Sequence, residues 1–282
     1  MAEPGAVTPP SSRFTDLKTR IGPALLVALI ALACLWLGGI WTAAIGAIAA
    51  GIMMAEWRTI TGQRLEDPVR TGALFIFACG WVPLMAWAQG PGLAVFGLLA
   101  MILYGAVRDA RHGYRSEGLW SSLGALYIGT AALALVMLRG VEPYGFLSIL
   151  WAALVVVAAD VGGYFAGRVF GGPKLWPAVS PKKTWSGLGG ALGLAFVVGG
   201  LFSWATTGTY FYQVCAVSVL AAILAQGGDL AESALKRHFG AKDSGTLLPG
   251  HGGVLDRLDG HMAALLVAAG FTFWRGQPVY IW

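Results

Sequence analysis

Charged residues are scarce in this chain: Asp, Glu, Lys and Arg make up only 12% of its 282 residues. A water-soluble domain carries roughly a quarter charged residues, so this composition excludes an ordinary soluble globular protein. Cysteine is also rare. Cys34, Cys79 and Cys215 lie in apolar stretches without paired spacing, which excludes a CxxC metal or redox motif and argues against a disulfide framework.

Apolar residues are abundant instead. Hydrophobic residues form 57% of the chain, and its mean hydropathy is +0.68. The 41 glycines suit close approach between membrane helices, because small side chains let two helix backbones come near each other. The composition therefore indicates an integral membrane protein.

Long apolar runs define the expected fold. A helix needs roughly 20 mainly apolar residues to cross a bilayer, and nine stretches approach that length. They cover about 22–39, 40–56, 73–89, 91–107, 119–138, 143–165, 186–205, 209–228 and 259–275. We expect an all-α polytopic membrane protein with about nine transmembrane helices.

The basic residues predict which loops face the cytoplasm. Cytoplasmic loops of membrane proteins are enriched in Lys and Arg. If the N-terminus is cytoplasmic, every Lys and Arg except Arg139 and Arg275 falls on the inner side. The same orientation leaves Glu142 as the acidic residue on the outside. We therefore expect an N-terminus inside and a C-terminus outside, in a bacterial cytoplasmic (inner) membrane.

Polar residues divide the chain into three parts. We expect a cytoplasmic tail over 1–21 and a scaffold of transmembrane helices over 22–142, whose interiors hold almost no charge. The region 143–282 carries two long inner loops, 166–185 and 229–258. Loops held by a rigid scaffold commonly carry function, so we expect the catalytic region there, facing the cytoplasm.

The segment 233–259 concentrates charge between two apolar runs. Its charged and titratable residues are Lys236, Arg237, Lys242, Asp243, His251, Asp256, Arg257 and Asp259. Glycines at 245, 250, 252 and 253 allow tight turns and close backbone approach. Carboxylates can hold Mg²⁺ while Lys and Arg neutralise phosphate oxygens. For His251, contact with a phosphate or metal-bound group and simple loop packing are equally good interpretations.

Four aspartates are candidate metal ligands. Asp256 and Asp259 are three residues apart, which places both carboxylates on one face of a helix; helix N-capping is the alternative. Asp160 and Asp229 each follow a long apolar run. A carboxylate at the membrane edge is costly and commonly functional, although a place in the headgroup zone would also explain it.

The loop 166–185 supplies a second set of candidates. Arg168, Ser180, Lys182, Lys183 and Thr184 precede or open the next apolar run. A helix N-terminus with adjacent cations binds anions well, so we expect these residues to bind substrate. Ordinary inner-side positive charge near anionic headgroups is the alternative.

These motifs resemble the phosphatidate cytidylyltransferase (CDP-diacylglycerol synthase) family. The resemblance rests on the signature from Ser233 to Asp259, which includes KRHFGAKDSG and LPGHGGVLDRLD. It is supported upstream by SPKKTW over 180–185 and by the pair Gly228-Asp229. One departure is plain: Ser186 stands where the family usually has Glu, which questions a capping or polar contact there.

The resemblance implies a transfer of the cytidylyl group of CTP to phosphatidic acid, giving CDP-diacylglycerol and pyrophosphate for phospholipid biosynthesis. It implies Mg²⁺, a second cation such as K⁺, and a homodimer among membrane lipids; no nucleic acid is expected. In these terms Asp229, Asp256 and Asp259 hold the metal, with Asp160 and Asp243 as second choices. The cations of the signature hold phosphates.

Two other functions fit parts of the pattern. A sister cytidylyltransferase acting on another lipid phosphate would share every motif. An ion-coupled transporter would also use membrane carboxylates, but transporters place them near the bilayer midplane, whereas these lie at the inner rim. The DGxxAR…GxxxDxxxD pattern of a CDP-alcohol phosphotransferase is absent from the sequence.

Overall fold

The computed structural model describes residues 13–62, 72–113, 115–245, 247 and 252–281. Within them the chain forms nine helices and one short β-hairpin. The elements are α1 (Arg13–Leu37), α2 (Gly39–Ile60), α3 (Gly72–Gln89), α4 (Pro91–Arg111), α5 (Arg115–Arg139), α6 (Gly145–Phe170), β1 (Lys174–Trp176), β2 (Ser180–Thr184), α7 (Trp185–Thr206), α8 (Phe211–His238) and α9 (Leu255–Arg275). The expected all-α class is confirmed.

The largest differences from the expected spans occur at three helix ends. α1 begins at Arg13, inside the segment 1–21 predicted as a tail, and α6 continues to Phe170. α8 continues to His238, so the first part of the predicted loop 229–258 is helical. Hydropathy marks where apolar residues end, but i,i+4 pairs such as Glu232 and Lys236 can stabilise further helical turns beyond that point.

Six helices of the described residues are long and apolar enough to cross a membrane: α2, α4, α5 from Gly118, α6, α7 and α8. The apolar parts of α1 and α3, Leu25–Leu37 and Ala73–Gln89, are shorter. α9 carries Asp256, Arg257 and Asp259 in its first turns. These helices support an integral membrane protein.

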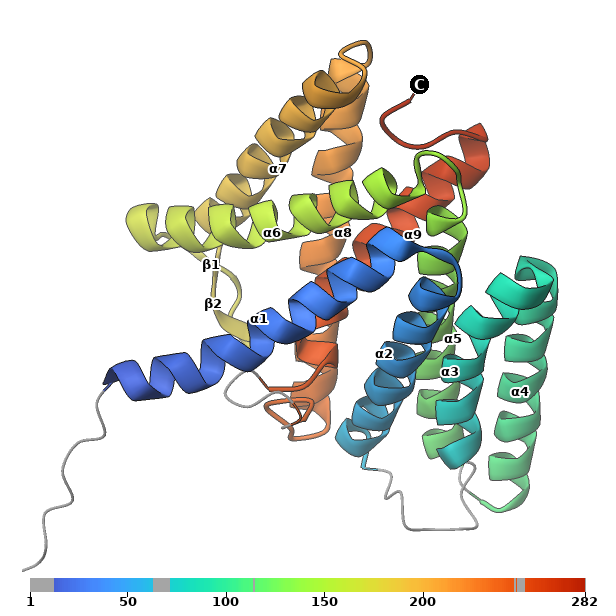
Figure 1. Cartoon of the computed structure of the whole chain (residues 1–282). Helices are drawn as coiled ribbons and strands as arrows, with labels where there is room; N and C mark the ends of the chain where they lie inside the picture. The colour runs from blue at the N-terminus through green and yellow to red at the C-terminus, as the bar shows by residue number, and fades with distance from the viewer. Residues whose placement is uncertain (1–12, 63–71, 114, 246, 248–251, 282) are drawn as a thin grey trace, which may run out of the picture.

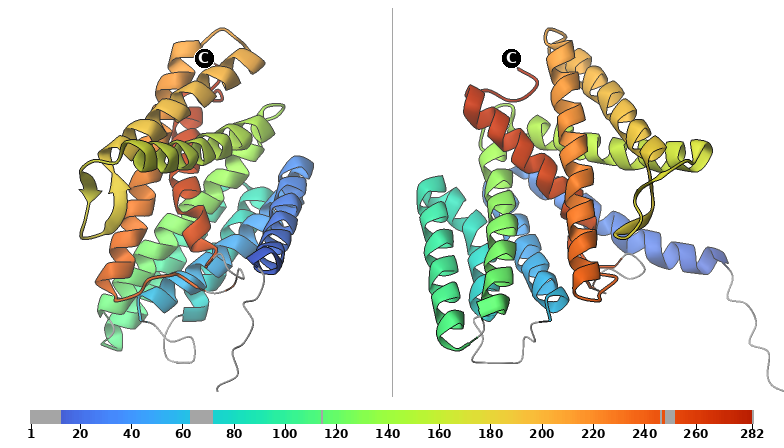
Figure 2. Two further views of the ribbon diagram at one scale, coloured as in Figure 1. Left: turned by 90° about the vertical axis from the view of Figure 1, so that its left-hand side faces the viewer. Right: turned by 180° about the vertical axis from the view of Figure 1, so that it is seen from behind.

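The helices form two groups joined by α9. In Figures 1 and 2, α2 to α5 stand together, whereas α6, α7 and α8 form the other group. α9 packs against α5, α6 and α8 and also touches α2. Its Met262 belongs to the core shared with α2, α3 and α5, and its Val267 belongs to the core shared with α6, α7 and α8.

Small residues bring α6 and α7 into close contact. A Cβ atom added at Gly162 would lie 2.9 Å from Leu194 Cβ and would overlap the Gly190 carbonyl, while one at Gly190 would overlap Ala166. Deeper in the same group, Trp151 Nε1 donates to Ser218 Oγ at 3.0 Å. This packing fits the membrane role predicted for the glycines.

The β-hairpin positions the start of α7. β1 and β2 are antiparallel, with Lys174 opposite Thr184 and Trp176 opposite Ser180. Thr184 then caps α7, since its hydroxyl accepts from the Gly187 N–H at 3.1 Å. The hairpin thereby brings the basic residues of β2 beside α8.

Candidate active site

A small polar cavity lies where α6, β2 and α8 meet. Lys183 Nζ is 2.6 Å from Asp229 Oδ2 and 3.0 Å from Gln226 Oε1. Gln226 Nε2 donates to Asp160 Oδ1 at 3.1 Å. The cavity has a volume of about 210 Å³, and Lys182 and Thr184 also line it. It thus combines two carboxylates with two ammonium groups, which suits a phosphate and a cation together.

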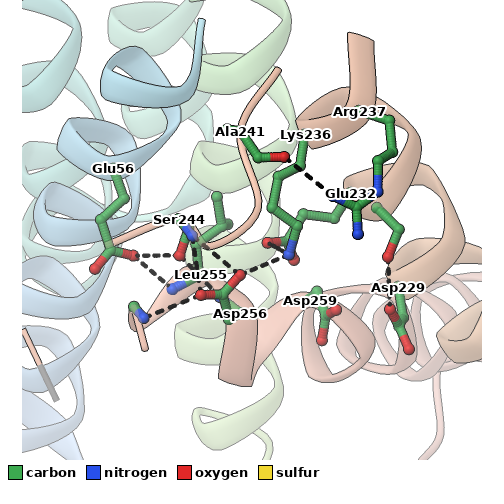
Figure 3. A network of polar contacts seen from close by, with 12 residues as sticks. Glu56, Asp229, Glu232, Lys236, Arg237, Ala241, Ser244, Leu255, Asp256 and Asp259 are labelled. Carbon is green, nitrogen blue, oxygen red and sulfur yellow. Dashed lines mark hydrogen bonds and ion pairs between the residues drawn. The ribbon is translucent and has the colours of Figure 1, made fainter. Parts of the chain in front are cut away.

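A second polar network joins α8 to the start of α9 (Figure 3). Lys236 Nζ lies 2.6 Å from Asp256 Oδ1 and 3.1 Å from Glu232 Oε1. Asp256 Oδ2 also accepts from the N–H groups of Ser244 and Gly253, each at 3.0 Å. Burial by itself would raise the pKa of Asp256, but Lys236 and these backbone donors outweigh it and hold that pKa well below its usual range.

Glu56 of α2 holds the loop before α9 from the other side. Its carboxylate accepts from Val254 N at 3.0 Å, Leu255 N at 2.7 Å and Ser244 Oγ at 3.4 Å. Only 8% of Glu56 is exposed. Sequence reasoning missed this residue. The available signal was an acidic residue at the inner end of an apolar run, in GIMMAEWR.

An apolar groove of about 1290 Å³ runs between α5, α8 and α9. Its wall includes Leu123, Leu224, Leu266 and Trp274, and Glu232 and Asp259 also line it. Trp57 and Trp120 line it as well, joined by a hydrogen bond of 2.8 Å from Trp57 Nε1 to the Trp120 carbonyl. The lining is predominantly apolar with few polar groups, as is typical of sites that bind a hydrophobic ligand.

The groove and the polar cavity meet on α8. Gly228 lines the groove, while the next residue, Asp229, lines the polar cavity. Asp229 and Asp259 are close enough to interact electrostatically, and both appear in Figure 3. One end of the apolar groove therefore adjoins the charged cavity.

The structure brings only part of the predicted site together. Asp160, Asp229, Lys182, Lys183 and Thr184 surround the polar cavity. Lys236 and Asp256 form the second network, and Asp259 lines the groove. Lys182, Lys183 and Thr184 come from the predicted loop 166–185, and Asp229, Lys236 and Asp256 come from the predicted loop 229–258. Asp160 and Asp259 lie at the ends of the predicted spans next to these loops.

Other predicted residues line neither cavity. Ser180 is half-buried at the start of β2, and Arg168 donates to the Tyr164 hydroxyl at 2.7 Å on the exposed end of α6. Arg237 donates to the Ala241 carbonyl at 3.4 Å. Lys242, Asp243 and Arg257 are exposed. His251 lies outside the described residues, as does Gly250.

The donor set is compatible with Mg²⁺, although the carboxylates are not gathered into a cage. Among the residues with described positions, no three His, Cys, Asp or Glu side chains are close enough to share one metal ion. Mg²⁺ usually takes one or two protein carboxylates together with substrate phosphates. Asp229 and Asp259 are two such carboxylates, and Asp229 is in contact with Lys183. Asp256 is engaged by Lys236 and by the N–H groups of Ser244 and Gly253, which precede α9, so it does not act as the N-cap of that helix.

Ser186, which replaces the usual Glu of the family, keeps a polar contact. Its hydroxyl donates to the Gly171 carbonyl and lies 3.0 Å from the Thr184 hydroxyl. Ser186 therefore connects the residue after α6 with the start of α7.

The chain is similar to known proteins over most of its length. The model of the cytidylyltransferase family matches residues 18–274. A phosphatidate cytidylyltransferase of Brucella suis is 39% identical over 256 residues, covering 89% of this chain and 91% of that protein. Those of Bacillus subtilis and Staphylococcus aureus are each 30% identical, covering 87% and 88% of this chain and 94% and 96% of theirs. The chain therefore belongs to the cytidylyltransferase family, which confirms the resemblance read from its motifs.

Proposed function

We propose that this enzyme transfers the cytidylyl group of CTP to phosphatidic acid, producing CDP-diacylglycerol and pyrophosphate. The observation that supports this most directly is the meeting of an apolar groove with a charged cavity at Asp229 and Asp259. A reaction between a lipid phosphate and a nucleoside triphosphate needs an apolar site for the lipid chains beside a charged site for the phosphates.

The groove provides a place for the acyl chains. It extends along α9 from Asp259 to Trp274, about 22 Å at 1.5 Å per residue, which is comparable to most of a lipid chain. The chains would contact α5, α8 and α9, and the phosphate would then lie near Asp259. Since the chains come from a bilayer that is already as apolar as the groove, the groove would orient the lipid, and the charged residues near its phosphate would supply most of the binding energy.

The polar cavity provides a place for the phosphates of CTP. Lys182 and Lys183 line it together with the capping residue Thr184 at the start of α7. Ammonium groups beside a helix N-terminus favour anions. In this proposal Lys183 exchanges its contact with Asp229 for a contact with a phosphate oxygen. Lys236 of α8, which lies beside Asp256 of α9, also contacts a phosphate.

The chemistry requires positioning more than a reactive side chain. A phosphate oxygen of phosphatidic acid attacks the α-phosphorus of CTP, a new P–O bond forms, and the bond to the β-phosphate oxygen breaks to release pyrophosphate. Asp229 and Asp259, with Asp160 nearby, would hold Mg²⁺, which neutralises the negative charge of the two phosphates. For Asp256 to join them, the ion would have to replace the Lys236 ammonium. A second cation such as K⁺ and a homodimer complete the proposal.

We further propose that nine helices span the inner membrane, with the N-terminus and the charged cavity of the active site on the cytoplasmic side. The distribution of Lys and Arg supports this orientation. Single cysteines replacing Glu142 and Lys242 test it in intact cells. A membrane-impermeant thiol reagent should label position 142 from outside and position 242 only after lysis; the reverse pattern would overturn the orientation.

Purified protein with labelled CTP and phosphatidic acid tests the reaction. We expect CDP-diacylglycerol and pyrophosphate in equal amounts with Mg²⁺, and a loss of at least about 100-fold in Asp229→Asn. Glu142→Gln is the matched control, because that carboxylate lines neither cavity and pairs with Arg139. Product from another lipid phosphate but none from phosphatidic acid would reassign the substrate, and transport without CTP consumption would refute the enzyme.

A further inference from the structure

Glu56 is the residue through which the first group of helices reaches the site. It lies on α2, almost 200 positions before its partners Val254 and Leu255. The four first N–H groups of a helix have no partner within the helix. At α9 the capping residue Val254 makes no side-chain cap, so the Glu56 carboxylate takes the place of a local capping side chain.

The contact is a buried, charge-assisted one. Glu56 Oε2 accepts from Leu255 N at 2.7 Å, and Oε1 accepts from Val254 N at 3.0 Å. A carboxylate bonded to N–H groups at a helix start also interacts favourably with the helix dipole. Hydrogen bonds to a charged group are about twice as strong as neutral ones, so this pair of bonds fixes where α9 begins.

The Glu56 carboxylate also explains why two positions before α9 are occupied by glycine. A Cβ atom added at Gly245 would lie 2.8 Å from Glu56 Oε1, and one at Gly253 would lie 2.7 Å from Glu56 Oε2 and overlap Ser244 Oγ. Gly252 has a φ of +86°, a conformation that favours glycine. The described residues on both sides of this loop thus lie close to Glu56, as Ser244 and Leu255 do in Figure 3.

We propose that Glu56 is a positioning residue for the cytidylyl transfer. By fixing the start of α9, it sets the places of Asp256 and Asp259, which follow within the first two turns. Ser244 bridges the two carboxylates, since its hydroxyl donates to Glu56 and its N–H to Asp256. The inference rests on the proposed function for its activity readout, but its structural readout does not depend on which reaction is catalysed.

The test combines kinetics with hydrogen exchange on the full-length protein in detergent. In Glu56→Ala we expect kcat to fall about 10- to 100-fold and the amides of residues 253–258 to exchange at least tenfold faster. Exchange in α5 should stay unchanged. Glu56→Gln, which keeps one acceptor oxygen, should be intermediate and provides the same test if Glu56→Ala does not purify. Glu142→Gln is the control and should match the wild type.

A second-site change separates positioning from general destabilisation. Val254 has a φ of −69°, which proline can adopt, and proline at a helix start removes a donor that would otherwise be unpaired. Glu56→Ala combined with Val254→Pro should regain at least threefold in kcat over Glu56→Ala alone.

Three results would overturn the proposal. One is a Glu56→Ala enzyme with kcat within twofold of the wild type. Another is faster exchange spread equally over α5 and α9, and the third is no rescue by Val254→Pro. An inactive wild type would refute the proposed reaction instead, and the exchange experiment would still decide the role of Glu56.

Discussion

Replacing Lys236 by methionine should strongly destabilise the contact between α8 and α9. The Lys236 ammonium lies between the carboxylates of Glu232 and Asp256. The three side chains are 13%, 5% and 12% exposed, respectively. Methionine keeps most of the length and apolar surface of lysine but removes the charge, so the two carboxylates lose the cation that lies between them.

The expected magnitude follows from that burial. Removing one partner of a buried ion pair costs about 3–5 kcal/mol, because the other charge remains uncompensated. For a chain of this size, a loss in that range lowers the unfolding temperature by about 10 °C. The change can be measured by intrinsic fluorescence during heating in detergent, since Trp57 and Trp120 lie near the network at the groove.

Two further variants make the reasoning refutable. Lys242→Met removes an exposed ammonium and should change stability by no more than about 0.5 kcal/mol. Lys236→Met combined with Asp256→Asn should recover part of the loss, because it removes the charge of the carboxylate closest to Lys236. A Lys236→Met protein as stable as Lys242→Met would show that the pair contributes nothing, and no recovery in the double variant would show that charge is not the cause.

Three other variants test separate parts of the site. At saturating lipid, Lys183→Ala should raise KM for CTP about 10- to 100-fold with a smaller effect on kcat. The control, Lys174→Ala, removes an exposed lysine and should match the wild type. Equal KM values for the two variants would remove Lys183 from the CTP site. Gly270→Leu places a side chain in open space within the groove and should shift product formation toward shorter acyl chains. The control, Gly189→Leu, adds a side chain in open space outside the groove and should leave the chain-length profile unchanged. Identical profiles for the two variants would place the lipid elsewhere. Because the pKa of Asp256 is lowered in the folded state, its contribution to stability is full above about pH 4 and is lost as pH falls through the lower folded pKa. The unfolding temperature of Asp256→Asn should therefore depend less on acid than that of the wild type. An unchanged dependence would contradict the ion pair.

Hydropathy was sufficient to place the helices because lipid imposes one requirement on every span. Backbone groups in a bilayer must bond within the chain, which favours uninterrupted apolar helices. The expected spans therefore match the observed helices closely, for example 73–89 against Gly72–Gln89 and 186–205 against Trp185–Thr206. They fall short at the start of α1 and at the ends of α6 and α8, where the helices continue beyond the predicted apolar runs.

The candidate residues were predictable by type and segment, but their pairing was not. Aspartates and lysines between apolar runs indicated phosphate chemistry, and their motifs indicated the family. The sequence could not show that Lys183 contacts Asp229 or that Lys236 contacts Asp256. Nor could it assign a role to Glu56, since its partners lie at the far end of the chain.

Some properties of this protein thus follow from its sequence alone, and others from its tertiary structure. Composition, the length of the apolar runs and the placement of Lys and Arg are local properties, so the amino-acid order alone established a helical membrane protein and the chemical character of its polar segments. Distances between side chains remote in sequence depend on how α2, α8 and α9 pack. Only the tertiary structure showed that an apolar groove long enough for an acyl chain adjoins a charged cavity. It also showed that Glu56 of α2 binds the first N–H groups of α9.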